Sequence, residues 1–125
     1  MKKAIKTEKA PAAIGPYSQG IMTDAWVFAS GQIPLNPNSM EMVGSTVEAQ
    51  TEQVLRNLSA VLEAEGLGLK DLVKTTVYLK NMADFPKFNA VYEKFMVAPY
   101  PARATVEVSA LPKGALVEIE GIACR

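Results

Sequence analysis

The chain of 125 residues contains no histidine and one cysteine, Cys124. Without an imidazole, the chain cannot build a Ser-His-Asp or Cys-His catalytic device, and histidine-based zinc sites are excluded. One thiol forms neither a disulfide within the chain nor a metal cluster. A reducing, cytoplasmic environment is therefore expected.

An excess of either charge and long apolar runs are also missing. Thirteen Lys and Arg balance thirteen Asp and Glu, and 49% of the residues are hydrophobic. Proteins that bind nucleic-acid phosphates usually carry an excess of basic over acidic residues, so nucleic acid is not an expected partner. No segment approaches the ~20 apolar residues of a membrane helix, and no secretory signal is recognisable. The length predicts a single domain over residues 1–125 that acts away from membranes.

Hydrophobic periodicity predicts strands and two helices. Ser45 and Glu48 have the spacing of a capping box that starts one helix, which Gly66 ends. Asp84 is the expected N-cap of the second helix. The expected strands span residues 4–7, 17–23, 26–33, 71–80, 103–108 and 116–124. In the strand 71–80, alternation places four residues on the face expected to be buried: Val73, Thr75, Val77 and Leu79. This order predicts an α+β fold with one mixed sheet and two helices on a single face.

The second face of such a sheet has no covering layer within the chain. In the last strand one parity is apolar, while the other mixes acidic and apolar side chains: Leu116, Glu118, Glu120, Ile122 and Cys124. A partly apolar face without a third layer predicts burial against another copy of the chain.

Arg103 and a pair of carboxylates are the main candidates for chemistry. Arg103 begins a strand with no acidic residue beside it, and its guanidinium fork suits a carboxylate or phosphate ligand. A surface arginine at a strand end is an equally weighted interpretation. Glu118 and Glu120 lie on one face of a strand, where paired carboxylates can divide acid and base roles. From the residues alone, a solvated sheet face is the favoured interpretation of this pair.

Four other residues complete the inventory. Asn89, beside the apolar stripe of the second helix, donates either into a site or to a backbone group. Tyr17 either places its phenol over a ligand or packs against other side chains of the chain. Gly31, which follows Ser30 inside an apolar strand, either allows a close approach or marks a bulge. The residues alone therefore indicate a small anionic-ligand site with a carboxylate nearby.

Four segments carry a more specific pattern. They are residues 12–20 (AAIGPYSQG), 30–34 (SGQIP), 89–92 (NAVY) and 101–108 (PARATVEV), and VEIE at 117–120 closes the pattern. In this order they resemble the Rid family of reactive intermediate deaminases, also called the YjgF/YER/UK family, and most closely its RidA subgroup. The resemblance spans essentially the whole chain.

This resemblance implies a chorismate-mutase-like α+β fold and a homotrimer with three sites in the clefts between subunits. It also implies hydrolysis of 2-imino or 2-enamino acids to 2-keto acids and ammonia, without cofactor or metal. Such substrates include 2-aminoacrylate, 2-iminobutanoate and 2-iminopropanoate, which leave pyridoxal-phosphate-dependent threonine and serine dehydratases. This hydrolysis is compatible with the candidate residues of the chain. An iminium carbon is already electrophilic, so the addition of water needs only positioning and proton transfer.

The resemblance also implies roles for individual residues. The carboxylate-binding arginine of the family falls on Arg103 and its acidic water-handling residue on Glu120. The pocket-shaping positions fall on Tyr17, Ser30, Gly31 and Asn89. Many relatives carry a cysteine where this chain has Thr105, so thiol-dependent regulation is not expected here.

Two other functions remain open at this stage. One is a small-metabolite-binding regulatory trimer that uses the Arg103 site without turnover. The other is the endoribonuclease or translation-inhibitor role that some family labels carry. The lack of histidine and of any strand combining aromatic and basic residues argues against the second.

Overall fold

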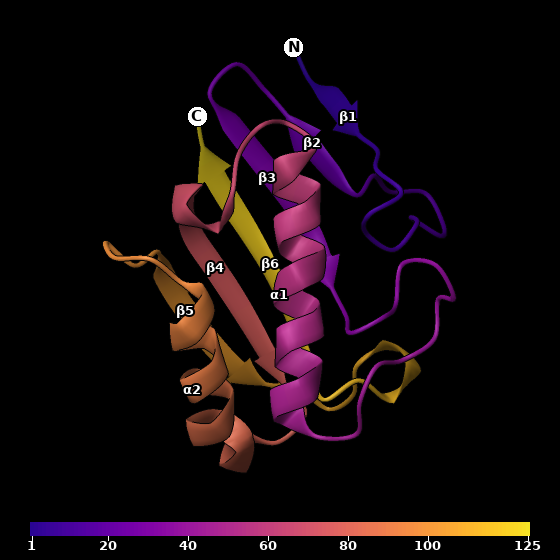
Figure 1. Ribbon diagram of the computed structural model, residues 1–125, viewed down its shortest axis with the longest axis vertical. Helices are drawn as coiled ribbons and strands as arrows, with labels where there is room; N and C mark the ends of the chain where they lie inside the picture. Colours follow the sequence, from indigo (N-terminus) through magenta and orange to yellow (C-terminus); the bar gives the residue numbers. More distant parts are fainter.

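Six β-strands form one mixed sheet, and two α-helices cover one of its faces (Figure 1). The computed structural model describes all 125 residues. The strand order is β1-β2-β3-β6-β4-β5, and only β4 and β5 pair in parallel. The strands are β1 (Lys3–Ile5), β2 (Gly20–Met22), β3 (Trp26–Gln32), β4 (Leu72–Leu79), β5 (Ala102–Glu107) and β6 (Val117–Cys124). The two-layer α+β prediction is confirmed.

The longer helix, α1 (Val47–Glu63), begins one residue later than the sequence predicted. Its N-cap is Thr46, whose Oγ1 accepts a hydrogen bond from the amide of Ala49 at 3.2 Å. Ser45 is therefore not the capping residue. The helix buries an apolar stripe against the sheet: Val54, Leu55, Leu58, Val61 and Leu62. Each such side chain contributes about 1.5–3 kcal/mol on burial, so the stripe fixes α1 on the sheet.

The shorter helix, α2 (Phe85–Phe95), follows a 3₁₀ turn (Met82–Asp84) and contacts α1. Asp84 occupies the N-cap position as predicted, although its side chain makes no capping hydrogen bond. Phe88 and Tyr92 point from α2 into the core. Neither helix combines the length and apolar character that a membrane crossing needs.

The start of β4 differs from the simple alternation that its sequence predicted. Thr75, Val77 and Leu79 are completely buried as expected, but Val73 is 41% exposed and Leu72 is buried in its place. The pairing of β4 with β6 shifts register between Leu72 and Lys74. A bulge turns successive side chains to different faces than strict alternation would.

The other sheet face is not covered within the chain. Trp26 and Phe28 of β3 and Val106 of β5 stand on it with 42% to 44% of their surface exposed. In β6 the predicted parity holds, because Val117 and Ile119 are buried and the intervening Glu118 points to the opposite face.

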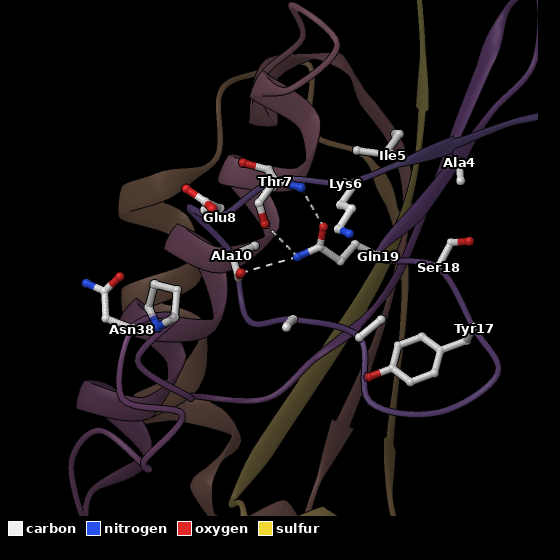
Figure 2. Close-up of a pocket in the computed structure, with 13 residues that line it drawn as sticks. Ala4, Ile5, Lys6, Thr7, Glu8, Ala10, Tyr17, Ser18, Gln19 and Asn38 are labelled. Atoms are coloured by element: carbon white, nitrogen blue, oxygen red, sulfur yellow. Dashed lines mark hydrogen bonds between the residues drawn. The ribbon is translucent and has the colours of Figure 1, made fainter.

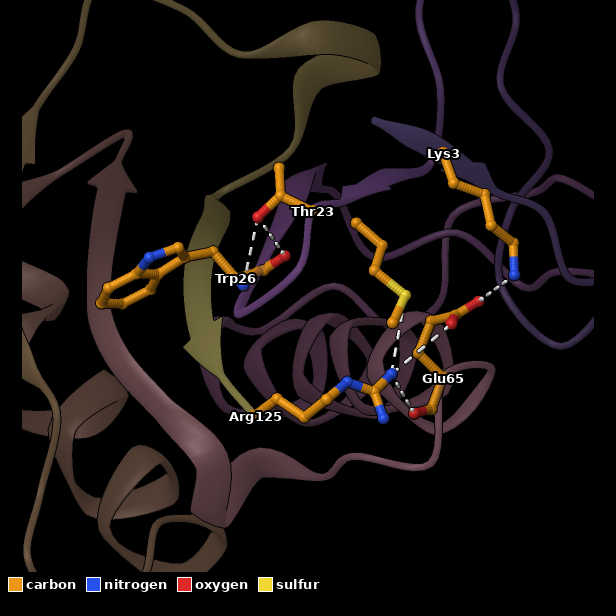
Figure 3. Close-up of polar contacts among 6 residues, drawn as sticks. Lys3, Thr23, Trp26, Glu65 and Arg125 are labelled. Carbon is orange, nitrogen blue, oxygen red and sulfur yellow. Dashed lines mark hydrogen bonds and ion pairs between the residues drawn. The ribbon is translucent and has the colours of Figure 1, made fainter. Parts of the chain in front are cut away.

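Glu65, just after α1, contacts residues of the edge strand β1 and of the segment that follows the central strand β6. Nη2 of Arg125 lies 3.2 Å from the carbonyl oxygen and 3.7 Å from Oε1 of Glu65, and Nζ of Lys3 lies 3.8 Å from Oε2 (Figure 3). The backbone amide of Arg125 donates to the carbonyl of Ala25 at 2.9 Å. Exposed ion pairs add little stability singly, so the contacts orient these segments more than they strengthen the fold.

Candidate functional site

Arg103 lies on β5, the edge strand, and its side chain reaches toward α2. Its Nη1 donates to Oδ1 of Asn89 at 2.8 Å, and the guanidinium packs against aromatic rings of the same helix. No carboxylate lies within ion-pair distance of Arg103. No acidic side chain therefore neutralises the guanidinium, and most of its five N–H donors are available to another anion.

A cleft of about 350 Å³ opens beside this guanidinium. Its lining residues are Asn89, Tyr92, Glu93, Tyr100, Pro101 and Arg103. A pocket of this size accommodates a small metabolite. The cleft is thus suited to a small carboxylate held by the arginine fork.

A second candidate corner lies on the uncovered sheet face, where β3 meets β6. The register of these strands shifts between Ala29 and Gln32, so Gly31 lies in an irregular stretch. A Cβ atom added to Gly31 would overlap the carboxylate of Glu118. Gly31 therefore provides both a bulge and a close approach, and the approaching group is a side chain of the chain itself.

The Glu118 carboxyl is half-buried, and this environment changes its proton affinity. Burial raises the pKa of the Glu118 carboxyl, and the negative charge of Glu120 raises it further. A carboxylate whose pKa is raised toward the working pH is a stronger base when ionised. Glu118 is therefore the better suited of the two acids for proton transfer.

Glu120 is exposed and already has a partner. The Tyr78 hydroxyl donates to Oε1 of Glu120 at 2.7 Å. This hydrogen bond, with burial and the charges of Glu120 and Glu118, raises the pKa of Tyr78 to about 12. The phenol thus stays protonated and remains a donor to Glu120, which leaves that carboxylate less free to handle water.

Tyr17 and Ser30 lie on the same side of the molecule as Gly31. The Ser30 hydroxyl donates to the carbonyl of Ser18 at 2.6 Å, which fastens the segment after Tyr17 to β3. The Tyr17 ring is 54% exposed and borders a cavity of about 1040 Å³ beside the first strand (Figure 2). Buried Gln19 stabilises the segment that lines this cavity, because its Nε2 donates to the carbonyls of Ala10 and Pro11 at 3.2 Å and 2.8 Å.

The predicted site residues therefore form two groups. Arg103 and Asn89 meet on the helix side of the sheet, whereas Gly31 and the two acids lie on its uncovered side. No hydrogen bond or ion pair joins the groups within one chain. Nothing in the sequence pattern ranks Glu118 above Glu120, although a glycine inside an apolar strand was a usable signal.

No group of three or more acidic or cysteine side chains is placed to hold a metal ion. The buried polar atoms near Arg103 include the hydroxyl of Thr105, which has no hydrogen-bond partner. Thr105 occupies the position at which many members of the resembled family carry a thiol.

Comparison with known proteins identifies the family. The family described as endoribonuclease L-PSP matches residues 7–125. The chain is 51% identical over 128 residues to the 2-iminobutanoate/2-iminopropanoate deaminase of Escherichia coli K12, covering 100% of this chain and 99% of that protein. It is 49% identical over 122 residues to Reactive Intermediate Deaminase A of Arabidopsis thaliana, a chloroplastic protein, covering 98% of this chain and 65% of that one.

The solved structure of Escherichia coli TdcF with bound serine matches with a TM-score of 0.93 and 41% identity, covering 98% of both chains. The chain therefore belongs to the endoribonuclease L-PSP family, which is the Rid or YjgF family that its motifs resemble.

Proposed function

We propose that this protein hydrolyses 2-imino and 2-enamino acids, such as 2-iminobutanoate, 2-iminopropanoate and 2-aminoacrylate, to 2-keto acids and ammonia. The un-neutralised Arg103 fork in its small cleft is the observation that carries the proposal. The full-length similarity to a deaminase of these acids supports it. Arg103 binds the substrate carboxylate through two parallel hydrogen bonds, which separates imino acids from imines without a carboxylate.

The reaction is the addition of water to a carbon–nitrogen double bond. Water attacks the iminium carbon and loses one proton to a carboxylate, and this proton passes to the nitrogen. The carbon–nitrogen bond then breaks while the new hydroxyl gives its remaining proton to the carboxylate, so that ammonia leaves and the carbon keeps the oxygen as a ketone. The carboxylate passes this second proton to the ammonia, which leaves the site as ammonium. Enamino acids enter the same route after protonation at carbon. The step needs positioning and proton transfer, which side chains supply without a covalent intermediate.

Glu118 is the carboxylate that fits this proton transfer, and Glu120 is its competitor. The raised pKa of Glu118 and its place against Gly31 favour it, while Glu120 is exposed and bonded to Tyr78. The role that the family resemblance gave to Glu120 thus stays a prediction to be tested beside Glu118.

A complete site requires two copies of the chain. Arg103 and Glu118 lie on opposite sides of one sheet, and the uncovered face carries apolar side chains such as Trp26 and Phe28. Packing of this face against the edge of another copy would bring the two groups together in one cleft. The homotrimer with sites between its subunits is therefore part of the proposal, with Tyr17, Ser30 and Gly31 lining the same clefts.

Pyridoxal-phosphate-dependent threonine and serine dehydratases are the proposed source of the substrates, because they release enamines of this class. A cytoplasmic location, where such enzymes act, stays a prediction.

A binder without turnover is the second candidate. The relative TdcF has a structure with bound serine, a carboxylate ligand that contains no imine. The two functions differ in one measurement, the release of ammonia and keto acid in an assay coupled to a dehydratase. Incubation with RNA tests the endoribonuclease activity of the family's description.

Mixing two variants of low activity tests the enzyme and its shared site together. Arg103→Lys keeps the charge but not the fork, and should lower kcat/KM about tenfold to a hundredfold. After Arg103→Lys and Glu118→Gln chains are unfolded and refolded together, a site between subunits should regain about a quarter of wild-type activity, since random assembly gives that share of intact sites.

Two results would contradict this proposal. Recovery no greater than the sum of the separate variants would place both residues in one subunit or outside the site. A light-scattering mass near the monomer value of 13.5 kDa would remove the trimer altogether.

A further inference from the structure

The guanidinium of Arg103 rests on three aromatic rings of α2. Its Cζ lies 5.3 Å from the ring centroid of Phe85, 5.9 Å from that of Phe88 and 4.8 Å from that of Tyr92. Positions three and four residues apart share one helix face, so the rings and Asn89 line up beneath the cation. Tyr92 makes the closest approach.

Tyr92 is itself held by a residue of the sheet. Its hydroxyl lies 2.7 Å from Oγ1 of Thr75, and both residues are buried, with 6% and 0% of their surface exposed. Thr75 is also the partner of Arg103 in the β4–β5 ladder. The contacts therefore close a ring: the Arg103 backbone pairs with Thr75, Thr75 bonds Tyr92, and Tyr92 faces the guanidinium.

This arrangement orients a charge without neutralising it. Burial raises the pKa of Tyr92, while the Thr75 hydrogen bond and the Arg103 charge act in the opposite direction. A neutral phenol attracts the cation through its ring face alone. The N–H groups that Asn89 does not use stay available to a ligand.

We infer that Tyr92, fixed by its hydrogen bond to Thr75, is a positioning residue that sets the direction in which Arg103 presents its fork to the substrate carboxylate. The inference rests on the proposed function only for the identity of the ligand. Without the Thr75 hydroxyl, the Tyr92 hydroxyl has no buried partner and the ring must shift to reach water. The support beneath the guanidinium then changes, although Arg103 itself is intact.

Substitutions at Thr75 test the inference through the affinity for a 2-keto acid. Calorimetric titration with 2-ketobutyrate should show about five- to tenfold weaker binding by Thr75→Val. Thr75→Ser keeps the hydroxyl and should bind as the wild type does. Thr51→Val is the matched control, because Thr51 is equally buried but its hydroxyl has no partner.

Kinetics separate positioning from a structural role. The carboxylate is held in both the ground and the transition state, so KM should rise by the same factor while kcat stays within about twofold. A lower kcat with unchanged KM and affinity would mean that Thr75→Val merely lowers the folded fraction, and would overturn the inference.

The double variant Thr75→Val/Tyr92→Phe removes both hydroxyls, so neither is left buried without its partner. It should regain thermal stability relative to Thr75→Val yet keep the weak binding. Recovery of wild-type affinity would show that packing alone positions Arg103.

If the wild type binds 2-ketobutyrate without deaminating imino acids, the proposed function fails, and these affinities still decide the inference. Absence of binding by the wild type would overturn both.

Discussion

The Arg103 cleft and the Gly31–Glu118 corner treat a charged side chain in opposite ways. Arg103 has only neutral partners, the Asn89 amide and aromatic rings, so no acidic side chain offsets its charge. Glu118 lies against backbone in a half-buried place beside Glu120, and its pKa is raised. A ligand-binding group must stay charged, whereas a proton-transfer group works best when its two protonation states are close in free energy. The surroundings of each side chain match these separate tasks.

The strongest test of this contrast compares Glu118→Gln with Glu120→Gln. If Glu118 transfers the proton, Glu118→Gln should lower kcat about 100-fold or more, as for other general bases. Affinity for 2-ketobutyrate should stay near that of the wild type, because Arg103 supplies the binding. The coupled assay and calorimetry measure the two quantities.

Glu120→Gln is the matched control on the same strand face. It should change kcat only a few-fold, through its effect on the charge near Glu118. A loss in Glu120→Gln as large as that in Glu118→Gln would restore the role to Glu120. Unchanged activity in both variants would leave the pair as solvated carboxylates.

Gly31→Ala should have a smaller effect by displacing the carboxylate rather than removing it. The added methyl group overlaps the end of the flexible Glu118 side chain, so the carboxylate moves while the fold is little affected. A misplacement of about 1 Å lowers catalysis about tenfold to a hundredfold. Measured kcat should fall in this range without a comparable fall in Tm.

Gly68→Ala serves as its control, because a Cβ atom at Gly68 meets nothing within 4 Å. Combining Gly31→Ala with Glu118→Gln should add little further loss, since both act on the same carboxylate. Additive losses would separate Gly31 from Glu118 and assign the glycine to backbone geometry.

The smallest expected effect is a displacement of the pH profile. A base must be ionised, so kcat/KM should fall as the pH drops through the raised pKa of Glu118. Glu120→Gln removes a negative charge that raises this pKa, and the acidic limb should therefore move to lower pH. Profiles of kcat/KM against pH for the wild type and the variant measure the displacement. Coincident limbs would show that the two carboxylates do not interact.

The sequence predicted the fold where a repeating pattern extended over many residues. The stripe of α1 and the alternation of β6 each determine a buried face, and both predictions are confirmed. The failures occurred where one residue breaks a pattern. Val73 is exposed because a register shift at the start of β4 turns Leu72 inward. Such a shift depends on the pairing of distant strands and leaves no local signal.

The site was predictable only in part, for a similar reason. Arg103 and Asn89 could be named as candidates, but their contact requires α2 to lie over β5. Glu118 and Glu120 are equivalent by alternation, and only the bulge beside Gly31 and the partner Tyr78 distinguish them. The division of the residues between two sheet faces follows from the register of β5 against β4, which the sequence does not reveal.

The fit of Glu118 against Gly31 also constrains how this fold diverges. A side chain at position 31 and a carboxylate at position 118 compete for the same space, so substitutions at the two positions are coupled. Loss of the carboxylate leaves room for a larger residue at position 31, whereas a larger residue beside the carboxylate must displace it. Residues 31 and 118 are therefore expected to change together among relatives of this chain.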